Sequence, residues 1–429
     1  MADGENKENR NFLQMLFSKN NKPDLIPKDI HKIDNSLIEI DAKKVIYRLK
    51  RFGYQAYIVG GAIRDLLLGK KPKDFDVATD AKPNEIKKIF CNARLIGRRF
   101  KLVHIIFKDR IIETATFRAN IKTKKGIIIN DNKFGTIEED ALRRDFGINA
   151  LYYDIESENI IDYVNGYKDI QKRRIRTLKK ADISFLEDPV RMIRAIKYSI
   201  LLNCKIEKKI ENSIKKNSSQ IKKCSPFRLL EEINKIIKAE KAKDILVKLA
   251  SSKLLKHFIP IIDEEIRGDN SKLYLKRLEI FDKEKDNLKE IEEKIDLFWS
   301  IMLFEKVKSQ INNEDPILSI STCLKNYLYV IKSPRKTVEN ITKIYYNYIK
   351  INGLIQEPKE ELNSVIARMR RTKYYNVFVY FVKIIGDKEV EEIFKPLKKR
   401  NSKHKKFRSK KKKKFFKMVK TEKNSTVPN

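Results

Sequence analysis

Two adjacent glycines followed closely by two acids constrain this chain more than any other feature. An apolar run ends at Gly60 and Gly61, a short helical segment follows, and the next strand-like run, Asp74–Ala78, carries acids at its first and third positions. Because side chains alternate between the two faces of a strand, we expect Asp74 and Asp76 to project from the same side. The sequence thus predicts two carboxylates held close together beside a sharp backbone turn.

These acids and glycines together predict a site for a metal-bound phosphate. Two carboxylates so close repel each other unless a cation lies between them, and their hard oxygen atoms suit Mg²⁺. The paired glycines allow the backbone to approach a phosphate, with amide groups at the start of the following helix facing it. A phosphate cradle beside a metal-binding carboxylate pair indicates nucleotide chemistry.

The charge of the chain indicates a polyanionic partner. Its 429 residues include 95 Lys and Arg against 58 Asp and Glu, a formal net charge of +37. A genome rich in A and T would raise the lysine content, as it raises Ile and Asn, but would not leave the acids so outnumbered. Such an excess favours binding to a polyanion, and the length is typical of two or three domains.

The composition also indicates the compartment. The four cysteines, Cys91, Cys204, Cys224 and Cys323, form no CxxC pair and have no zinc-like spacing to histidine, so we expect reduced thiols. No apolar run approaches the roughly 20 residues of a membrane span, and the N-terminal residues lack the pattern of a signal peptide. We therefore expect a cytoplasmic protein with no membrane partner.

Strand-like runs dominate between about residues 36 and 165. The candidates are Ala56–Val59, Asp74–Ala78, Leu102–Phe107, Arg110–Thr116 and Asn149–Asp154, with helices expected at Asp41–Phe52 and Asn84–Phe90. The runs Leu102–Phe107 and Arg110–Thr116 are expected to form a hairpin that turns at Lys108 and Asp109. This part of the chain is therefore expected to be a small mixed-sheet domain.

Helical periodicity replaces the strand pattern in most of the remainder. Leu288, Ile291, Ile295, Phe298 and Met302 recur at intervals of three and four residues, which is typical of one helix of a bundle. The apolar run 374–385 fits a strand or a buried helix equally well. The predicted fold class is α+β, with a mixed-sheet head at 36–165, a helical neck at 166–260 and a helical body and tail at 261–397.

The two ends of the chain differ from the rest. Residues 1–35 are polar and are predicted to form a loose extension. The segment 398–429 carries 14 Lys or Arg and no acid between Lys398 and Lys420, with Phe407 among them, so it is expected to be disordered. It is either a solubilising tail or a sequence-independent RNA tether, and we favour the tether.

Glu113 lies in a strand-like run whose alternate positions are otherwise apolar. An acid there is either a surface residue or a third metal ligand on a neighbouring strand. Beside Asp74 and Asp76 we favour the ligand. Three carboxylates holding two ions fit the in-line two-metal scheme, in which the ions activate an attacking hydroxyl and neutralise leaving pyrophosphate.

Two further clusters carry charged residues in patterns that suit a nucleotide. Arg143, Arg144 and Asp145 either form local helix pairs or bind a triphosphate and a ribose hydroxyl. Asp188 before a proline is a good helix start, yet it also places its carboxylate three residues before Arg191. An acceptor beside a donor fits the edge of adenine or cytosine but not that of guanine or uracil, which offers a basis for selection.

Three motifs occur in the order found in one family. They are GGxxRD followed by DxD at Gly60–Asp76, RRDFxINAL at Arg143–Leu151 and EDPVRMxRA at Glu187–Ala195. With them the chain resembles the class II nucleotidyltransferases, which include bacterial poly(A) polymerases and CCA-adding tRNA nucleotidyltransferases. The resemblance extends from about Pro27 to Pro260.

The resemblance implies a role for each matching residue. By it, Asp74, Asp76 and Glu113 are catalytic and bind two Mg²⁺ ions, and Asp145 is also catalytic. The expected nucleotide-binding residues are Gly60, Gly61, Arg64, Arg143, Arg144, Asp145, Asn149, Asp188, Arg191 and Arg194. The implied activity is template-independent addition of AMP from ATP to the 3′ ends of RNA, whether mRNA, tRNA or another transcript.

Several segments resemble the poly(A)-adding members more than the CCA-adding ones. They are Leu66–Leu68, Arg94–His104, Phe134–Asp140, Pro226–Glu232 and the basic tail. Gly147 stands where the family usually has threonine, and Asn165 replaces a glycine. CCA addition to tRNA with CTP and ATP is the alternative activity. An inactive RNA-binding adaptor is a second alternative, but it would be expected to have lost a carboxylate.

Deletion of residues 398–429 is expected to flatten the salt dependence of RNA binding, because fewer counterions would be released from the RNA. RNA affinity measured over a range of salt concentrations, with and without the segment, tests this. Identical slopes would mean that the tail is a bystander.

Overall fold

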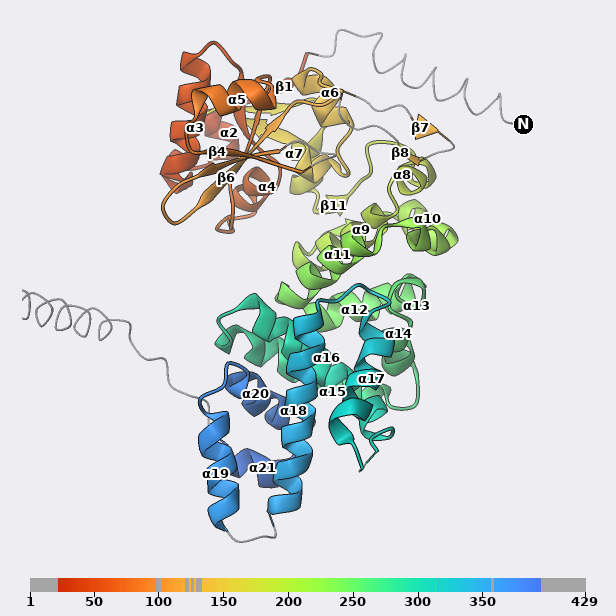
Figure 1. Ribbon diagram of the computed structural model, residues 1–429. Coiled ribbons are helices and arrows are strands. Elements are labelled where there is room, and N and C mark those ends of the chain that lie inside the picture. The colour runs from red at the N-terminus through yellow and green to blue at the C-terminus, as the bar shows by residue number, and fades with distance from the viewer. Residues whose placement is uncertain are drawn as a thin grey trace, which may run out of the picture. The chain divides into compact units, whose positions relative to one another are not determined.

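The computed structural model describes residues 22–97, 102–119, 123–124, 127–128, 133–312, 314–355 and 359–394. The chain divides into two compact units, one comprising residues up to 283 together with 321–338, and the other comprising 284–320 and the residues from 339 onward. The first unit contains a mixed sheet and helices, and the second is helical (Figure 1). The predicted α+β class is confirmed, whereas the predicted basic tail at 398–429 lies outside the described residues.

An eight-stranded sheet forms the head of the first unit, in the order β1-β10-β9-β2-β3-β6-β5-β4. Its strands are β1 (Asp24–Ile26), β2 (Ala56–Val59), β3 (Asp76–Thr79), β4 (Ala93–Ile96), β5 (Leu102–Ile106), β6 (Ile111–Thr116), β9 (Leu151–Tyr153) and β10 (Ile160–Asp162). β3 and β6 run parallel to each other, and every other pair of neighbouring strands in this sheet is antiparallel. A two-stranded ribbon of β7 (Thr123–Lys124) and β8 (Ile127–Ile128) stands apart from this sheet.

The predicted strands occur, with shifted ends. β2 has the predicted bounds, and the β5–β6 hairpin closes where the Phe107 amide donates to the Arg110 carbonyl at 2.8 Å. β3 begins only at Asp76, so Asp74 precedes the strand instead of opening it. Exposure still alternates from Asp74 to Val77, which keeps both acids on one side. Likewise the predicted strand at 149–154 shortens, because a 3-10 turn ends at Asn149.

The polar extension predicted at 1–35 is too long. β1 pairs with β10 at the edge of the sheet, and α2 (Lys28–His31) follows, with the His31 ring bonded to the Glu158 carbonyl at 2.8 Å. A three-residue edge strand leaves no alternating pattern long enough to find in a sequence. Residues 1–21 lie outside the described part of the chain.

Helices α3 (Ile40–Arg51) and α5 (Pro83–Ile89) pack against the sheet beside each other (Figure 1). Both were predicted, within one residue at each end. The fully buried Val45, Ile46 and Leu49 line the sheet-facing side of α3. This apolar stripe, with charged residues between its members, is what the sequence of an amphipathic helix provides.

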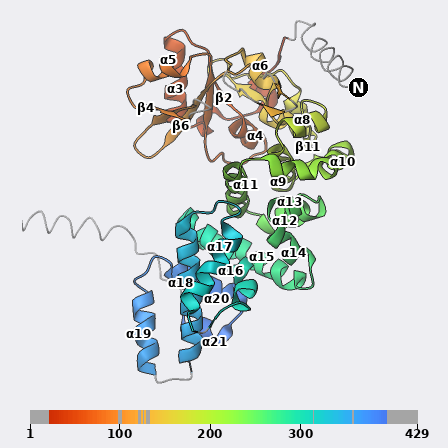
Figure 2. The ribbon, with the colours of Figure 1, turned by 45° about the vertical axis from the view of Figure 1, so that its right-hand side comes forward.

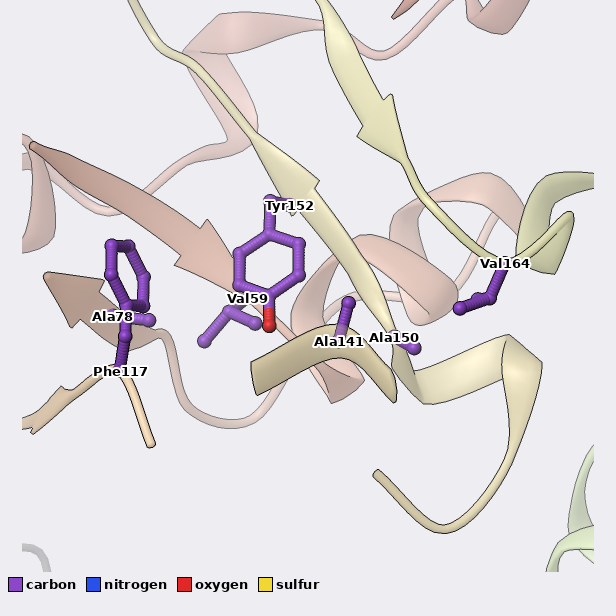
Figure 3. Close-up of a cluster of buried hydrophobic side chains, with 7 residues drawn as sticks. All are labelled: Val59, Ala78, Phe117, Ala141, Ala150, Tyr152 and Val164. Atoms are coloured by element: carbon purple, nitrogen blue, oxygen red, sulfur yellow. The ribbon is translucent and has the colours of Figure 1, made fainter. Parts of the chain in front are cut away.

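A second hydrophobic cluster lies beneath the site described below (Figure 3). It joins the sheet to α6 (Ile137–Leu142) and consists of Val59, Ala78, Phe117, Ala141, Ala150, Tyr152 and Val164. Figure 3 shows the Tyr152 ring lying between the strands and α6, with its hydroxyl directed toward the helix. That hydroxyl donates to Asp140 at 2.6 Å, so the apolar core ends in a polar contact.

Helices form the rest of the first unit (Figure 2). They are α4 (Gly61–Leu67), α7 (Gly166–Gln171), α8 (Ala181–Glu187), α9 (Val190–Leu201), α10 (Lys208–Asn217), α11 (Pro226–Lys238), α12 (Ala242–Ser251), α13 (Leu255–Phe258), α14 (Pro260–Arg267) and most of α15 (Ser271–Glu284). A short parallel pair, β11 (Arg174–Ile175) and β12 (Lys205–Ile206), flanks α9. A buried ion pair between Lys197 and Glu232 at 2.6 Å ties α9 to α11.

The second unit is built from α16 (Ile291–Lys308), α19 (Lys359–Met369), α20 (Tyr375–Ile385) and α21 (Lys388–Ile393), while α17 (Pro316–Leu328) and α18 (Arg335–Leu354) cross the boundary. Phe304 packs its ring against Tyr345 and Phe381. The ambiguous run 374–385 is therefore a buried helix. Leu288 lies before α16, although the predicted periodicity included it.

None of the described helices is both long and apolar enough to span a bilayer. All four cysteines are free thiols, as predicted.

Gly166 and Gly353 are expected to respond oppositely to replacement by alanine. A Cβ on Gly166 would lie 2.2 Å from the Gly147 carbonyl oxygen, whereas none of the described atoms lies within 4 Å of a Cβ on Gly353, in the last turn of α18. Overpacking should cost Gly166→Ala about 1–3 kcal/mol of unfolding free energy, while Gly353→Ala should gain a few tenths to about 1 kcal/mol from helix propensity. Urea unfolding measures both; equal effects would contradict the packing.

Candidate active site

One cavity in the first unit, with a volume of about 1920 Å³, brings together every residue predicted for the site. Its lining includes Gly60, Gly61, Arg64, Asp74, Asp76, Glu113, Arg143, Arg144, Asp145, Asn149, Asp188, Arg191 and Arg194. These residues come from the sheet, from α4 and α9, and from the segments between them. The fold therefore joins the three sequence motifs in a single space.

The turn at Gly60 makes room for two guanidinium groups. Its φ of +75° is a backbone conformation that favours glycine. A Cβ on Gly60 would lie 3.4 Å from an Arg144 nitrogen, and one on Gly61 would lie 3.4 Å from an Arg64 nitrogen. Paired glycines here thus allow basic side chains, as well as a ligand, to approach the backbone.

The carboxylates share one face of the sheet. β3 and β6 run parallel with Val77 opposite Thr114, so the preceding residues, Asp76 and Glu113, lie on adjacent strands and project to the same side. His104 is the cross-strand partner of Glu113, with 3.5 Å between its Nε2 and the Glu113 Oε1. The prediction that Glu113 stands on a neighbouring strand is confirmed, whereas its role as a ligand stays a prediction.

The surroundings of Asp76 disfavour its negative charge. Burial among the cavity walls and the nearby Glu113 and Asp74 carboxylates raise the pKa of Asp76 to about 6, against an opposing effect of Arg144. Solvent still reaches the side chain through the cavity. A carboxylate destabilised in this way gains from a bound cation.

The residues present fit a divalent ion that is completed by its substrate. Within the described ranges, no group of three or more His, Cys, Asp or Glu side chains is placed to hold a metal ion by itself. Mg²⁺ seldom needs one, because it keeps several waters and is commonly held by one or two carboxylates together with substrate phosphates. The oxygen donors of Asp74, Asp76 and Glu113, facing one cavity, are the type that such an ion takes.

Arg143 and Arg144 are both held by one buried acid, Asp140. The distances from their guanidinium nitrogens to the Asp140 oxygens are 2.7 and 2.9 Å. Burial opposes ionisation of Asp140, but the two arginines and the Tyr152 hydroxyl outweigh it and hold the pKa of Asp140 well below its usual value. Arg144 also lies over the Tyr152 ring, 5.2 Å from its centroid. The local pairing predicted as one interpretation is therefore present.

Asp145 belongs to a second network that links the head to α9. Its carboxylate accepts from the Asn149 amide at 3.1 Å and pairs with Arg194 at 3.0 Å. Asn149 in turn accepts from Arg64 at 2.7 Å. Burial raises the pKa of Asp145, but Arg194 and the Asn149 bond lower it more, so the net shift is downward. Asp145 is thus an anion oriented at the cavity wall.

Asp188 and Arg191 both face the cavity without pairing with each other. Asp188 lies 3.3 Å from the Val190 amide, and its other oxygen pairs with Arg228 at 2.8 Å. The predicted helix start is one residue too early, because α9 begins at Val190 with Pro189 as its N-cap and with no side-chain cap bond. Arg191 is buried and donates to the Ser184 hydroxyl at 2.9 Å and to the Arg143 carbonyl at 3.3 Å. Each side chain is therefore held by its own partners, and the reading of a base stays a prediction.

Two further contributors escaped the sequence analysis. Tyr198 lines the cavity and lies beneath Arg64 and Arg194, with 5.0 and 5.8 Å from its ring centroid to the guanidinium carbons. Its position one helical turn after Arg194 was the available signal. Arg228, the partner of Asp188, belongs to α11. Because the two residues are 40 positions apart in the sequence, no local pattern indicated their contact.

The two departures from the family pattern have structural explanations. A Cβ on Gly147 would lie 2.2 Å from an oxygen of the fully buried Asp169, which pairs with Arg176 at 2.8 Å. Glycine at 147 therefore leaves the space that Asp169 fills. Asn165 has a φ of +59°, a left-handed conformation that asparagine tolerates better than most residues.

Comparison with known proteins extends these observations. The family described as "Poly A polymerase head domain" matches residues 56–176, and "Probable RNA and SrmB- binding site of polymerase A" matches 203–266. The resemblance to the class II nucleotidyltransferases is confirmed. Poly(A) polymerase I of Salmonella typhi is 42% identical over 249 residues, which cover 56% of this chain and 54% of that protein.

A CCA-adding enzyme of Bacillus pumilus is more distant, 34% identical over 211 residues that cover 49% of this chain and 52% of that protein. The chain thus spans about half the length of the curated relatives it matches. The crystal structure of the Bacillus stearothermophilus CCA-adding enzyme in complex with CTP matches with a TM-score of 0.56 at 24% identity, covering 84% of this chain and 90% of that one. That likeness shows a shared fold.

Asp76→Asn is expected to raise thermal stability at pH 7. An acid whose pKa rises on folding, here from 3.8 to about 6, destabilises the folded state as pH increases through that interval. The advantage of Asn should therefore shrink below pH 6 and vanish near pH 3.8. Melting temperatures measured across this range test it, with Asp109→Asn in the exposed β5–β6 turn as the control.

The same two variants also test ion binding without an activity assay. Added Mg²⁺ should raise the melting temperature of the wild type and of Asp109→Asn, because it binds only the folded state, and should have little effect on Asp76→Asn. Equal responses of all three proteins would contradict the assignment of Asp76 as a ligand.

Proposed function

We propose that this chain is a template-independent adenylyltransferase that adds AMP from ATP to RNA 3′ ends and releases pyrophosphate. The observation that carries the proposal is the single cavity shared by the carboxylates, the arginine networks and the Asp188–Arg191 pair. We also propose that it acts in the cytoplasm, where ATP and RNA 3′ ends are both available. The similarity to poly(A) polymerases over residues 56–176 supports this activity.

In the reaction proposed, the RNA 3′ hydroxyl attacks the α-phosphorus of ATP. A bond forms between that oxygen and phosphorus, the hydroxyl proton passes to solvent, and the bond from phosphorus to the bridging oxygen of the β-phosphate breaks, so that pyrophosphate leaves. Asp74, Asp76 and Glu113 would hold two Mg²⁺ ions. When bound, these ions would lower the pKa of the RNA 3′ hydroxyl and neutralise the negative charge of the leaving pyrophosphate. No covalent enzyme intermediate is needed.

The chain's own residues bind and orient the nucleotide. Arg143 and Arg144 offer guanidinium groups to the triphosphate, and Asp140 fixes both of them before the substrate arrives. Asp145 is kept ionised by Arg194 and can accept a hydrogen bond from a ribose hydroxyl. Groups already fixed in place lose little entropy on binding.

Selection of the base rests on an acceptor and a donor held at separate points. Arg228 fixes one oxygen of Asp188, and Ser184 fixes the guanidinium of Arg191. The adenine edge offers an amine donor beside a ring-nitrogen acceptor, which matches this pair, whereas guanine would oppose donor to donor. A mismatch would leave buried polar groups unpaired, which is costly.

CCA addition to tRNA is the second candidate because its chemistry and motifs are the same. Five matching poly(A) polymerases are 42–44% identical to this chain over about half of its length, whereas three matching CCA-adding enzymes are 34–35% identical, which favours the first activity. Part of the polymerase-like segment Arg94–His104, residues 98–101, lies outside the described residues. An inactive adaptor is disfavoured because all three carboxylates are present.

The decisive experiment supplies purified protein with Mg²⁺, labelled RNA, and either ATP or CTP alone. One RNA is a tRNA without its CCA end, and the other is an unstructured oligomer. Long ladders with ATP on both RNAs are expected. Addition that needs CTP first, stops after three nucleotides and occurs only on tRNA would identify the CCA-adding activity instead.

Asp74→Ala and Asp76→Ala are each expected to abolish incorporation while RNA binding stays nearly unchanged, because the acids serve the metal and not the RNA. Incorporation and RNA affinity are measured on the same preparations. Asp244→Ala, an exposed acid of α12 away from the cavity, is the matched control. If either active-site variant still incorporated AMP, the assignment of that acid as a metal ligand would be wrong.

A further inference from the structure

The cavity is larger than ATP requires. Pockets for small ligands commonly measure about 300–1000 Å³, and this cavity has about 1920 Å³. The residues assigned to the nucleotide line one part of it. The remainder extends past Glu113 between two segments of the head to which no role has been given, namely residues 36–43 and the β5–β6 turn at 106–111. We call this extension the hairpin groove.

Exposed apolar side chains line the hairpin groove. Leu37, Ile40 and Ile111 are 61%, 67% and 50% exposed, and the partly buried Phe107 lies beside them in the lining. Three exposed aliphatic side chains that line the same cavity next to a polar site indicate a binding surface. The Phe107 ring is of the type on which a nucleobase stacks, and the aliphatic side chains add apolar surface for a base to contact.

The cavity also carries lysines that no acid neutralises. Of the acids in the two groove segments, Glu39 pairs with Arg110 and Asp41 with Lys44, which leaves Asp109. Lys71, Lys73 and Lys108 line the cavity and make no ion pair with any described residue. Their positive charges therefore remain available to phosphate groups. Apolar faces with lysines at the rim are the combination that single-stranded nucleic acid requires, since bases and backbone are contacted separately.

The two walls of the groove are fastened to each other. Arg110 of the turn forms an ion pair with Glu39, and Lys44 lies over the Phe107 ring, 6.0 Å from its centroid. Lys43 donates to the Asn35 carbonyl at 2.6 Å, which steadies the other wall. The groove is thus a formed feature of the head and not a gap between mobile loops.

The chemistry of the proposed function requires an occupant on this side. In-line displacement places the attacking hydroxyl opposite the leaving pyrophosphate. In the sheet, β9, whose Tyr152 hydroxyl contacts Arg144, lies on one side of β3 and β6, and β5 with the β5–β6 turn lies on the other side. A strand whose 3′ end lies in the groove would present its hydroxyl to Glu113 and Asp76.

We propose that the hairpin groove binds the last nucleotides of single-stranded RNA, with bases against Leu37, Ile40, Phe107 and Ile111 and phosphates near Lys71 and Lys108. This inference rests on the proposed function for its direction, but binding of RNA can be measured without catalysis. It makes the head a contributor to RNA binding, in addition to the segment 203–266 that matches an RNA-binding family.

The test compares a groove variant, Lys108→Glu with Ile111→Ala, and a matched control, Lys88→Glu with Leu25→Ala, both changing exposed residues of the head. The probe is a short 5′-labelled oligoadenylate without ATP, followed by fluorescence anisotropy. Loss of one stacked base and one phosphate contact should weaken binding about tenfold or more in the groove variant. The control should bind as the wild type does, and the KM for ATP should be unchanged in both.

A photoreactive thionucleotide at the last position of the oligomer gives a second readout, which does not depend on a substitution. Crosslinks are expected at residues 36–43 or 106–111. Equal affinity of groove variant and control, or crosslinks elsewhere, would overturn the proposal. If the wild type bound the oligomer in the groove yet incorporated no nucleotide, the proposed function would fail while the groove assignment stood. If the groove variant lost its thermal transition, Leu37→Ala, at a position that is 61% exposed, would replace it.

Discussion

The buried carboxylate of Asp140 is the interaction on which the site depends most. It lies within α6, accepts from the Tyr152 hydroxyl of the core, and holds Arg143 and Arg144 together. Without it, two adjacent cations would repel each other in a buried place, and the core tyrosine would lose its partner. The two arginines therefore stabilise the head domain itself, in addition to any role in binding a substrate.

A chain of polar contacts extends this support into the helical neck. Arg144 reaches the Asn149 carbonyl, Asn149 joins Arg64 to Asp145, and Asp145 pairs with Arg194 of α9. Networks of this kind are stable only when every member is satisfied. The residues of the three sequence motifs thus hold one another in position, which explains why they occur together.

Sequence reasoning located the site because its residues lie in compact motifs with strong local signals. Gly60 could be found from the glycine pair that ends an apolar run, and Asp76 from the alternation of side chains along a strand. Both residues line the cavity. Arg228 could not, because its contact with Asp188 depends on how α11 packs against α9. The start of β3 at Asp76 was also missed, since alternation of side chains continues beyond the end of hydrogen-bonded pairing.

The single parallel pair in the sheet has a consequence for how the site is assembled. Asp76 and Glu113 stand on neighbouring strands that run the same way, so no tight turn can join them. The segment that joins β3 to β6 contains α5, β4 and β5, and pairings between such distant segments close more slowly than local ones. A chain emerging from the ribosome would hold the glycine turn and Asp76 well before it could complete the acidic face.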